Sequence, residues 1–455
     1  MPSETSAART TKARMIPLRR TIPRLLRNPL KALEEIGRES GDAVVKLDLG
    51  LFRPYLVTNP KHVQHILLDN ADNYVREGMI WRPIRRLLGD GIVFDGPTWQ
   101  HRRKLIRPVL SAKNVDALID RMAEAIAEAV DDLVHPSRAQ QPIDACAEMT
   151  RIVHRAVIRV FFADTISTQD ADKLARATAA AFTSLGPRML LPFVPNSVPL
   201  PGDGTFRRAV RAVDEIMYPI VREARRNAAD GSDIVSLLLR ARDENGNGLD
   251  DRQVRDDFVA MFIGGTDTTS MALTWLWVVL DSYPDVADRL YAEIDRVVGS
   301  EKPGRIHLAD LRYTKMVLQE LVRLYPPVWI LPRTAKADDT IDGVDIKAGS
   351  TVVVSPYVTH RMESYWERPD VFDPERFSPD AAEPRQRFSY LSFGGGPHQC
   401  LGTHFFTVEG QLIAATLLSR YRPVLRGSSP PEPQAAVSLR PRRRVDVVLR
   451  PVEHS

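Results

Sequence analysis

Residues 251–280 constrain the fold more than any other segment of the sequence. From Phe258 onward, apolar side chains occupy nearly every face of the helix predicted there, and Asp250 stands before it as the predicted N-cap. A helix that is apolar all round must be covered on all sides, because apolar surface is unfavourable in water. The sequence therefore predicts a large protein built around a central helix.

Amphipathic helices are predicted for most of the remaining chain, because apolar residues recur there at spacings of three and four. These segments are 30–40, 61–68, 99–110, 115–133, 145–162, 169–185, 206–227, 234–242 and 401–421. Extended segments at 41–60 and 326–356 predict a small sheet to which both contribute. The proline-dense stretch 185–204 cannot continue a helix and is predicted to be a loop between two antiparallel helices.

The fold class predicted from this pattern is mainly α, with a small β-rich region. No internal repeat or domain linker interrupts residues 30–455, and we expect them to form a single catalytic domain. Residues 1–29 are basic, contain prolines and lack an apolar core. We therefore expect a poorly ordered N-terminal arm there and no signal peptide.

The composition narrows the class of protein. Of 455 residues, 44% are hydrophobic and 26% are charged, which is typical of a globular chain with a large core. The formal net charge is only +4, so we expect no nucleic-acid partner. The two cysteines, Cys146 and Cys400, lie far apart and fit a reducing compartment better than a disulfide scaffold. No run of about twenty apolar residues occurs, so we expect a cytoplasmic protein without a membrane span, and we also expect a monomer.

The segment 393–402, Phe-Gly-Gly-Gly-Pro-His-Gln-Cys-Leu-Gly, delivers a cysteine at the start of a predicted helix. The positive end of a helix and free backbone N–H groups lower the pKa of a thiol, as a thiolate metal ligand requires. Glycines let the backbone lie against a flat macrocycle, and Phe393 could shield the sulfur from water. The alternative is an inert cysteine buried in a glycine-rich turn.

This segment resembles the haem-binding pattern of the cytochrome P-450 family, Phe-x-x-Gly-x-Arg/His-x-Cys-x-Gly. The matching residues are Phe393, Gly396, His398, Cys400 and Gly402. The resemblance implies a haem b cofactor (iron protoporphyrin IX), with Cys400 as the axial thiolate ligand to the iron. It covers the chain from about Gly41 to the C-terminus and implies the family's fold, a triangular helical prism with a small β region.

Two further segments resemble family motifs that stabilise the fold. Glu320 and Arg323 match Glu-x-x-Arg, and Pro374-Glu375-Arg376-Phe377 resembles the segment whose arginine completes a buried charge network. In isolation the first pair would be a surface contact of about 0.2–0.5 kcal/mol. The resemblance implies a structural role instead, because removing one member of a buried pair costs about 3–5 kcal/mol.

Two adjacent glycines interrupt the long helix. The run Gly264-Gly265-Thr266-Asp267-Thr268 resembles the family's oxygen-activation motif, which implies that Gly264 and Gly265 leave room for dioxygen. Thr268 is then expected to hydrogen-bond the oxygen. Asp267 is expected to relay protons from solvent, because O–O cleavage consumes protons. The alternative is close packing between helices, which would also account for two glycines that cost roughly 1 kcal/mol each in a helix interior.

Four side chains are expected to contact the anionic haem propionates. Trp99 and Arg103 lie four residues apart on one predicted helix face and resemble the family's Trp-x-x-x-Arg motif. Arg333 and His398 occupy positions that face the propionates in the family. Each has an ordinary alternative as a core tryptophan, a surface arginine or a satisfied loop histidine.

The resemblance implies a monooxygenase that inserts one atom of O2 into a small lipophilic molecule, such as a terpenoid, fatty-acid-like compound, steroid or polyketide. Its pocket is expected to be lined by 79–94, 185–201, Met261 with Gly264, and 328–330. The chain has no room for a fused reductase, so electrons are expected from an acidic ferredoxin and its reductase.

The predicted docking residues for that ferredoxin are Arg102, Lys104 and Arg107, which follow Trp99 on a basic helix; the alternative is a merely solvated face. Two alternatives to a monooxygenase stay open. One is a non-catalytic haem sensor or carrier, and the other is an oxygen-independent haem-thiolate isomerase or dehydratase.

Overall fold

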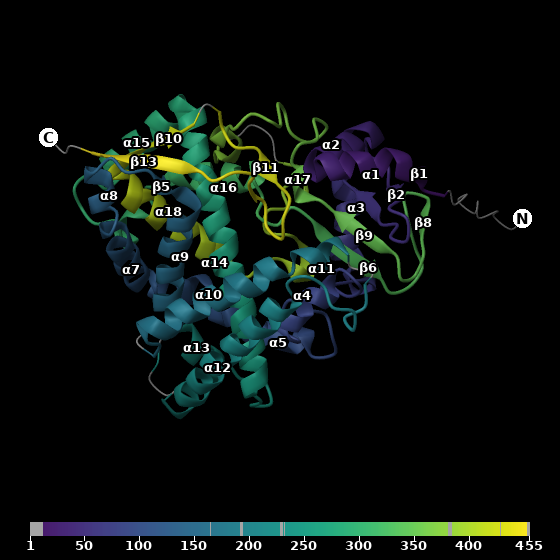
Figure 1. Ribbon diagram of the computed structural model, residues 1–455, viewed down its shortest axis with the longest axis horizontal. Helices are drawn as coiled ribbons and strands as arrows, with labels where there is room; N and C mark the ends of the chain where they lie inside the picture. The colour runs from purple at the N-terminus through teal and green to yellow at the C-terminus, as the bar shows by residue number, and fades with distance from the viewer. Residues whose placement is uncertain are drawn as a thin grey trace, which may run out of the picture. The chain divides into compact units, whose positions relative to one another are not determined.

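The computed structural model describes residues 12–163, 165–191, 194–227, 231, 233–380, 385–427 and 429–452. The chain divides into two compact units that alternate along the sequence. The first unit takes residues 1–82, 328–370 and 383–400, and the second takes 83–327, 371–382 and 401–455. Figure 1 labels their helices and strands.

A six-stranded sheet organises the first unit, in the order β1-β2-β3-β9-β6-β4. Its strands are β1 (Arg14–Ile16), β2 (Val45–Leu47), β3 (Tyr55–Val57), β4 (Tyr74–Val75), β6 (Leu331–Ala335) and β9 (Thr351–Val354). Strand β3 pairs in parallel with β9, with Tyr55 opposite Val352. This pairing confirms the prediction that segments 41–60 and 326–356 build one sheet. A hairpin of β7 (Asp339–Ile341) and β8 (Val344–Ile346) lies outside this sheet.

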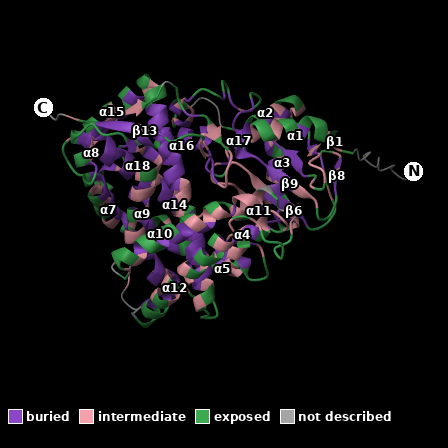
Figure 2. Cartoon of the chain, viewed as in Figure 1, coloured by how far each residue is buried: buried purple, intermediate pink, exposed green. Residues whose placement is uncertain are grey.

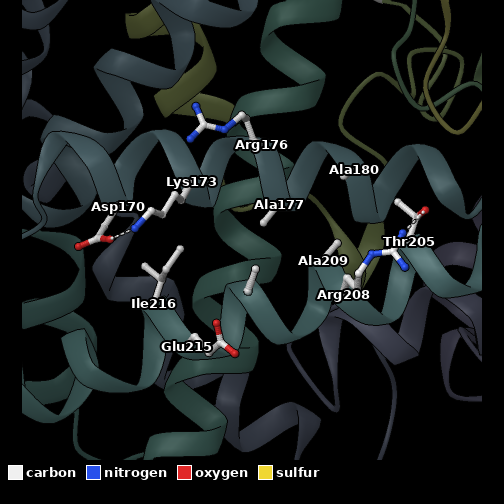
Figure 3. A pocket seen from close by; sticks show the side chains of 11 residues that line it. Asp170, Lys173, Arg176, Ala177, Ala180, Thr205, Arg208, Ala209, Glu215 and Ile216 are labelled. Carbon is white, nitrogen blue, oxygen red and sulfur yellow. Dashed lines mark hydrogen bonds and ion pairs between the residues drawn. The ribbon is translucent and has the colours of Figure 1, made fainter.

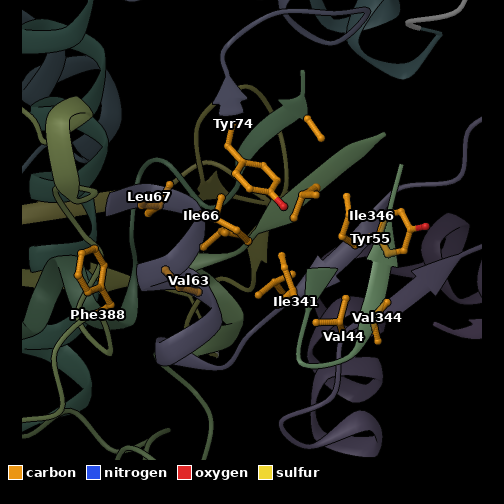
Figure 4. Close-up of a cluster of buried hydrophobic side chains, with 14 of the residues drawn as sticks. Val44, Tyr55, Val63, Ile66, Leu67, Tyr74, Ile341, Val344, Ile346 and Phe388 are labelled. Carbon is orange, nitrogen blue, oxygen red and sulfur yellow. The ribbon is translucent and has the colours of Figure 1, made fainter. Parts of the chain in front are cut away.

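The helices of the first unit are short. They are α1 (Leu18–Arg27), α2 (Pro29–Ser40), α3 (Pro60–Gln64), the π-helical turn η1 (His65–Asp69), η2 (Ala71–Asn73), α17 (Pro356–Thr359) and η5 (Gly396–His398). The single helix predicted over 61–68 is therefore α3 followed by a wider turn. Val63, Ile66 and Leu67 of this region pack into a buried apolar cluster with Tyr55 and Ile346 (Figure 4).

The second half of the predicted arm is ordered. Residues 14–16 form β1, which pairs in parallel with β2, and residues 18–27 form α1. The buried Thr21 hydroxyl donates to the carbonyl of Ile16 at 3.2 Å. The prediction of disorder rested on the high content of basic residues and proline in this segment. The segment is ordered because β1 pairs with β2, a strand about thirty residues further along the chain. Residues 1–11 lie outside the described residues, and the single domain over 30–455 stays a prediction.

The second unit is mainly helical. Its longer helices are α5 (Trp99–Val109), α7 (Ile119–Asp131), α9 (Ala145–Phe162), α10 (Thr168–Ser184), α12 (Asp203–Asn227), α14 (Asp251–Ser282), α15 (Pro284–Val297), α16 (Arg312–Leu324) and α18 (Thr403–Leu418). Shorter ones are α6 (Ala112–Ala117), α8 (Val134–Arg138), α11 (Gly186–Leu190), α13 (Ile234–Arg240), η3 (Arg305–His307) and η4 (Pro374–Phe377), and α4 (Trp81–Leu88) begins at the junction with the first unit. Strand β13 (Asp446–Pro451) pairs with β10 (Tyr421–Arg426) and β5 (Ile143–Asp144), and β11 (Pro433–Gln434) pairs with β12 (Arg440–Pro441).

Helix α14 is the core of the second unit, as its sequence predicts. The Asp250 carboxylate accepts the Gln253 backbone N–H at 2.8 Å, and the Gln253 side chain accepts the Asp250 N–H at 3.0 Å, so a capping box starts the helix. Helices α9, α12, α16 and α18 pack against it. Every residue from Val254 to Ile263 is buried, and Figure 2 shows α14 largely in the colour of buried residues.

Helix α18 and the segment 185–204 differ from the predictions. Helix α18 ends at Leu418, not Tyr421, because Tyr421 opens strand β10. The predicted loop 185–204 contains the short helix α11, and residues 192–193 lie outside the described residues. The buried Arg188 orders this loop by pairing with Asp203 and donating to the Pro195 carbonyl at 3.0 Å. Among the described helices, none combines the length and the apolarity that a membrane crossing requires.

Candidate haem-thiolate site

Cys400 ends a tight loop in the first unit. Its backbone N–H donates to the Phe393 carbonyl at 2.9 Å, which closes the loop. Gly394 and Gly396 have positive φ angles of 67° and 64°, and a Cβ on Gly396 would lie 1.7 Å from the Leu67 carbonyl oxygen. Only glycine fits position 396, for reasons of both conformation and space. The loop presents Cys400 exposed and in no disulfide, and the next helix begins two residues later than predicted, at Thr403.

Apolar packing anchors the segment that leads into this loop. Phe388 and Leu391 belong to the same buried cluster as Ile66 and Leu67, and Figure 4 shows the Phe388 ring on the side of that cluster where Leu67 lies. A Cβ on Gly395 would lie 2.4 Å from the Phe388 ring. The loop is thus seated against the η1 turn by side chains that precede its cysteine.

Two side chains from residues 360–366 also hold this segment. His360 Nε2 accepts the Leu391 backbone N–H at 2.8 Å in the core, so the neutral ring carries its proton on Nδ1. The Trp366 indole N–H donates to the Ser389 carbonyl at 3.3 Å. The sequence shows both residues, but nothing in the pattern assigned them a role in positioning the cysteine loop.

The glycine pair in α14 leaves one place open in the middle of a mostly buried helix. Gly264 is exposed, and a Cβ built on it would meet no atom within 4 Å. A Cβ on Gly265 would meet Val157 of α9 at 3.9 Å, an ordinary contact. Close helix packing therefore does not explain Gly264. The Thr268 hydroxyl one turn later donates to the Gly264 carbonyl.

Asp267 lies in a largely buried position beside the C-terminal segment of the second unit. Its carboxylate accepts a hydrogen bond from the Ser438 hydroxyl. Burial raises the pKa of Asp267, opposed by that hydrogen bond and by the positive charge of Arg440. The carboxyl group is therefore held by the protein at an elevated proton affinity, and Ser438, which the sequence did not single out, is its partner.

The four predicted propionate contacts have different surroundings. The Trp99 indole N–H, its only donor, donates to the Ile92 carbonyl at 2.9 Å. The Arg103 guanidinium lies 5.6 Å from the Trp99 ring centroid. In the first unit Arg333 is buried in β6 and donates to the Pro332 carbonyl, and His398 is half-buried in the cysteine loop. Their roles toward a propionate stay predictions, and for Trp99 the engaged N–H favours a positioning role.

Comparison with known proteins assigns the family. The family model described as Cytochrome P450 matches residues 16–447. The chain belongs to the cytochrome P450 family. It is 31% identical over 401 residues to cyclooctat-9-en-7-ol 5-monooxygenase of Streptomyces melanosporofaciens, covering 88% of this chain and 86% of the relative. It is 28% identical to pentalenene oxygenase of Streptomyces avermitilis over 93% of both chains. Its fold is similar to the crystal structure of the cytochrome P450DA haem domain, with a TM-score of 0.85, 21% identity and 98% of each chain covered.

As a cytochrome P450, the protein is a haem-thiolate monooxygenase that uses haem b, O2, a lipophilic substrate and redox partners. The described residues fit this cofactor. The first unit offers an exposed thiol on a loop shaped by obligatory glycines, and the second offers a helix with an open place at Gly264. Cys146 fits less well, because burial raises the pKa of its thiol and so disfavours the thiolate.

The predicted buried charge network of the P450 fold is confirmed in the second unit. Arg323 donates to both Glu320 oxygens, at 2.6 and 2.8 Å, and neither side chain is exposed. Arg376 lies 3.4 Å from Glu320, and the Asp373 backbone N–H donates to the same carboxylate at 2.9 Å. Burial raises the pKa of Glu320, opposed mainly by Arg323.

Arg102, predicted to dock a ferredoxin, faces inward. It is buried and pairs with Asp257 of α14 at 2.7 Å, and Asp257 also accepts the Ile92 N–H at 2.6 Å. Burial raises the pKa of Asp257 to about 6, opposed by Arg102. The prediction for Arg102 was wrong because a basic run does not reveal which side chain faces the core. Lys104 and Arg107 on the same helix are exposed.

Glu409 of α18 is a functional candidate that the sequence did not reveal. It is fully buried beside Thr269, and its oxygens have no hydrogen-bond partner of full geometry among the described residues. Burial raises the pKa of Glu409 well above its usual value, which favours the protonated acid. A glutamate in an apolar helix was the available signal, but only the fold shows that, among the described residues, no cationic side chain forms an ion pair with it.

Surface grooves lie apart from these residues. One of about 480 Å3 runs between α10 and α12 and is lined mainly by alanines and charged side chains such as Lys173, Arg208 and Glu215 (Figure 3). Another of about 600 Å3 is lined by Arg86, Phe206, Arg207, Val210 and Arg211. Arg86, from the predicted lining segment 79–94, borders the second groove. None of the other predicted site residues lines either groove, so the candidate site is defined by the side chains described above.

Proposed function

We propose that this cytochrome P450 hydroxylates a cyclic terpenoid, with Cys400 as the axial thiolate ligand and electrons supplied by a ferredoxin and its reductase. One observation carries the substrate class. The relatives that align over most of the chain include an oxygenase named for pentalenene and a monooxygenase named for cyclooctat-9-en-7-ol.

Haem, when bound, supplies the iron at which dioxygen is activated and its O–O bond cleaved. The chain's residues prepare the space around it. Gly264 leaves room on α14, and the Thr268 hydroxyl, now donating to the Gly264 carbonyl, is the donor that can turn toward a ligand in that space. We propose that the substrate pocket is lined by segment 79–94, which contains α4, by segment 185–201, which contains α11, and by Met261 and residues 328–330. Their mainly apolar character favours binding by desolvation.

Asp267 is proposed to hold the proton that this chemistry consumes. Its raised pKa makes the carboxyl a better proton store than an exposed aspartate, and Ser438 keeps it oriented. The proposed path runs from the Ser438 hydroxyl to the Asp267 carboxyl and on toward Thr268.

Turnover tests the proposed function. The holoprotein is supplied with NAD(P)H, a ferredoxin and its reductase, and separate panels of cyclic sesquiterpenes, cyclic diterpene alcohols and linear fatty acids. We expect an alcohol product from a cyclic terpenoid, with its new oxygen taken from labelled O2. Oxidation of fatty acids alone would overturn the substrate class. An isomerised or dehydrated product formed without O2 would instead support the oxygen-independent alternative.

A further inference from the structure

An exposed apolar stripe runs along α1 in the first unit. Leu18 and Leu26 are 43% and 82% exposed, and the half-buried Ile22 lies between them at successive spacings of four. Residues four apart share one face of a helix, so the three side chains form a continuous line. The residue that α1 buries is Thr21. Much of the apolar side of this helix therefore faces water. Single exposed leucines are common on protein surfaces, but a continuous line of them is not.

Neighbouring residues extend this stripe. Met15 of β1 is 47% exposed and Leu51, in the turn after β2, is 90% exposed. A Cβ on Gly50 would lie 3.7 Å from Leu18 Cδ1, so the turn lies against α1. Met15, Leu18, Ile22, Leu26 and Leu51 together are called the α1 patch. It holds four of the nine large hydrophobic side chains that are exposed in the described part of the chain.

The surroundings of the α1 patch are strongly basic. Residues 12–27 contain six basic side chains and no acidic one: Lys12, Arg14, Arg19, Arg20, Arg24 and Arg27. Arg24 pairs with Glu39 at 3.0 Å. The other five are exposed, and no ion pair joins any of them to a carboxylate among the described residues. The segment therefore presents unneutralised positive charge beside unburied apolar surface.

We propose that the α1 patch binds the surface of an anionic lipid bilayer. A basic helix with an apolar face lies in the plane of a membrane, with its leucines at the acyl boundary and its arginines among the phosphate groups. The α1 patch has this chemistry, and neither of the two grooves described above includes any of its residues. It also lacks the aromatic side chains that dominate protein–protein hot spots. The inference goes beyond the proposed oxidation and does not depend on it.

Vesicle flotation of the holoprotein tests this proposal. One set of vesicles is an equal mixture of phosphatidylglycerol and phosphatidylcholine, and the other is phosphatidylcholine alone. We expect the protein to float with the anionic vesicles at low salt and to bind the neutral ones far more weakly. Raising the salt concentration should reduce binding without abolishing it, because the electrostatic part is screened and the apolar part is not.

Matched variants identify the surface. Leu26→Glu should weaken partitioning into anionic vesicles by roughly tenfold or more, because it removes one buried leucine and adds repulsion. Ile306→Glu is the control, since Ile306 is 77% exposed in the second unit. Arg19→Glu with Arg27→Glu should act likewise, with Arg207→Glu and Arg211→Glu on α12 as the charge-matched control. The spectrum of the reduced carbon monoxide complex confirms that each variant is folded.

Three outcomes would overturn the proposal. The wild-type protein could fail to float with anionic vesicles, or Leu26→Glu could bind them as tightly as Ile306→Glu. In the third, sedimentation would show a dimer that Leu26→Glu dissociates while vesicle binding is absent. That result would assign the α1 patch to contact with a second copy of this chain.

Discussion

At the scale of single residues, the identity of the metal ligand follows from a comparison of two cysteines. Cys400→Ala should abolish the strongly red-shifted Soret band of the reduced carbon monoxide complex, because that band requires a thiolate that would hold the haem iron. Cys146→Ala is the matched control and should keep the band, since the Cys146 thiol is disfavoured as a thiolate by burial. Loss of the band in Cys146→Ala alone would reverse the assignment.

The Thr268 hydroxyl is expected to control coupling. Thr268→Ala should still bind haem and substrate, but product formed per NAD(P)H should fall and hydrogen peroxide should rise, with product turnover reduced about 100-fold. Thr268→Ser restores the hydroxyl and should recover most of the coupling. If Thr268 only packs the helix, both variants would lose about 1 kcal/mol of stability and keep the wild-type product ratio.

Glu409 is expected to give the protein a measurable pH dependence of stability. Its folded-state pKa lies above the unfolded value. The stability it contributes is therefore complete below the unfolded pKa and is lost as pH rises through the folded pKa. Glu409→Gln mimics the protonated acid, so the melting temperature of the variant, relative to that of the wild type, should increase as pH rises above the unfolded-state pKa of the glutamate. Glu244→Gln, at an exposed site, should show a constant difference, and a constant difference for Glu409→Gln would contradict the account.

Residue-level reasoning from the sequence succeeded where one side chain carries one chemical property. The spacing around Cys400 and the glycines at 264–265 identify both motifs without coordinates. It failed for Arg102, and it did not find Ser438 or His360, because their roles depend on partners between 31 and 171 positions away. The face of a helix that packs against the core is decided by tertiary contacts. A run of basic residues in the sequence does not show which of its side chains lies on that face.

At the scale of elements, the Glu320 network ties α16 to the segment 371–377. Glu320→Ala would leave the buried Arg323 and the partly buried Arg376 around a missing carboxylate, and it should lower the free energy of unfolding by about 3–5 kcal/mol. Lys173→Ala is the control, because it removes a pair of the same i,i+3 spacing on the exposed face of α10 and should cost about 0–1 kcal/mol. Denaturant titration measures both, and equal losses would contradict a structural role.

Element prediction worked best for strong helical periodicity. The bounds of helix α14 and its Asp250 cap were predicted nearly to the residue. In a helix of 32 residues the sequence pattern is long enough that a few atypical residues do not obscure it. The split of 61–68 into α3 and a π-helical turn was missed, since i→i+5 bonding leaves no distinct apolar period. Strands β10 and β13 were also missed, because the helix predicted over 401–421 reaches the start of β10 and because Arg422, Arg426 and Arg450 interrupt the apolar pattern of the two strands.

At the scale of the whole molecule, electron delivery should depend on long-range charge. Lys104→Glu with Arg107→Glu should slow reduction by an acidic ferredoxin at low salt, by about tenfold or more, and the difference should shrink as salt is raised. Arg207→Glu with Arg211→Glu makes the same change in net charge on α12 and should leave the rate near that of the wild type. Stopped-flow reduction under carbon monoxide reports this rate, and equal slowing by both pairs would show a net-charge effect without a docking site.

The pairing of β3 with β9 has a consequence for how the chain is made. Tyr55 and Val352 lie opposite one another in the sheet but about 300 positions apart in sequence. Ribosomes add roughly 5–20 residues per second, so β3 must wait on the order of 15–60 s for its neighbour to be synthesised. Throughout that interval a buried, apolar strand has an unfilled edge, which is the surface that recruits other unfinished chains. The yield of folded protein should therefore depend on the speed of translation between these two strands.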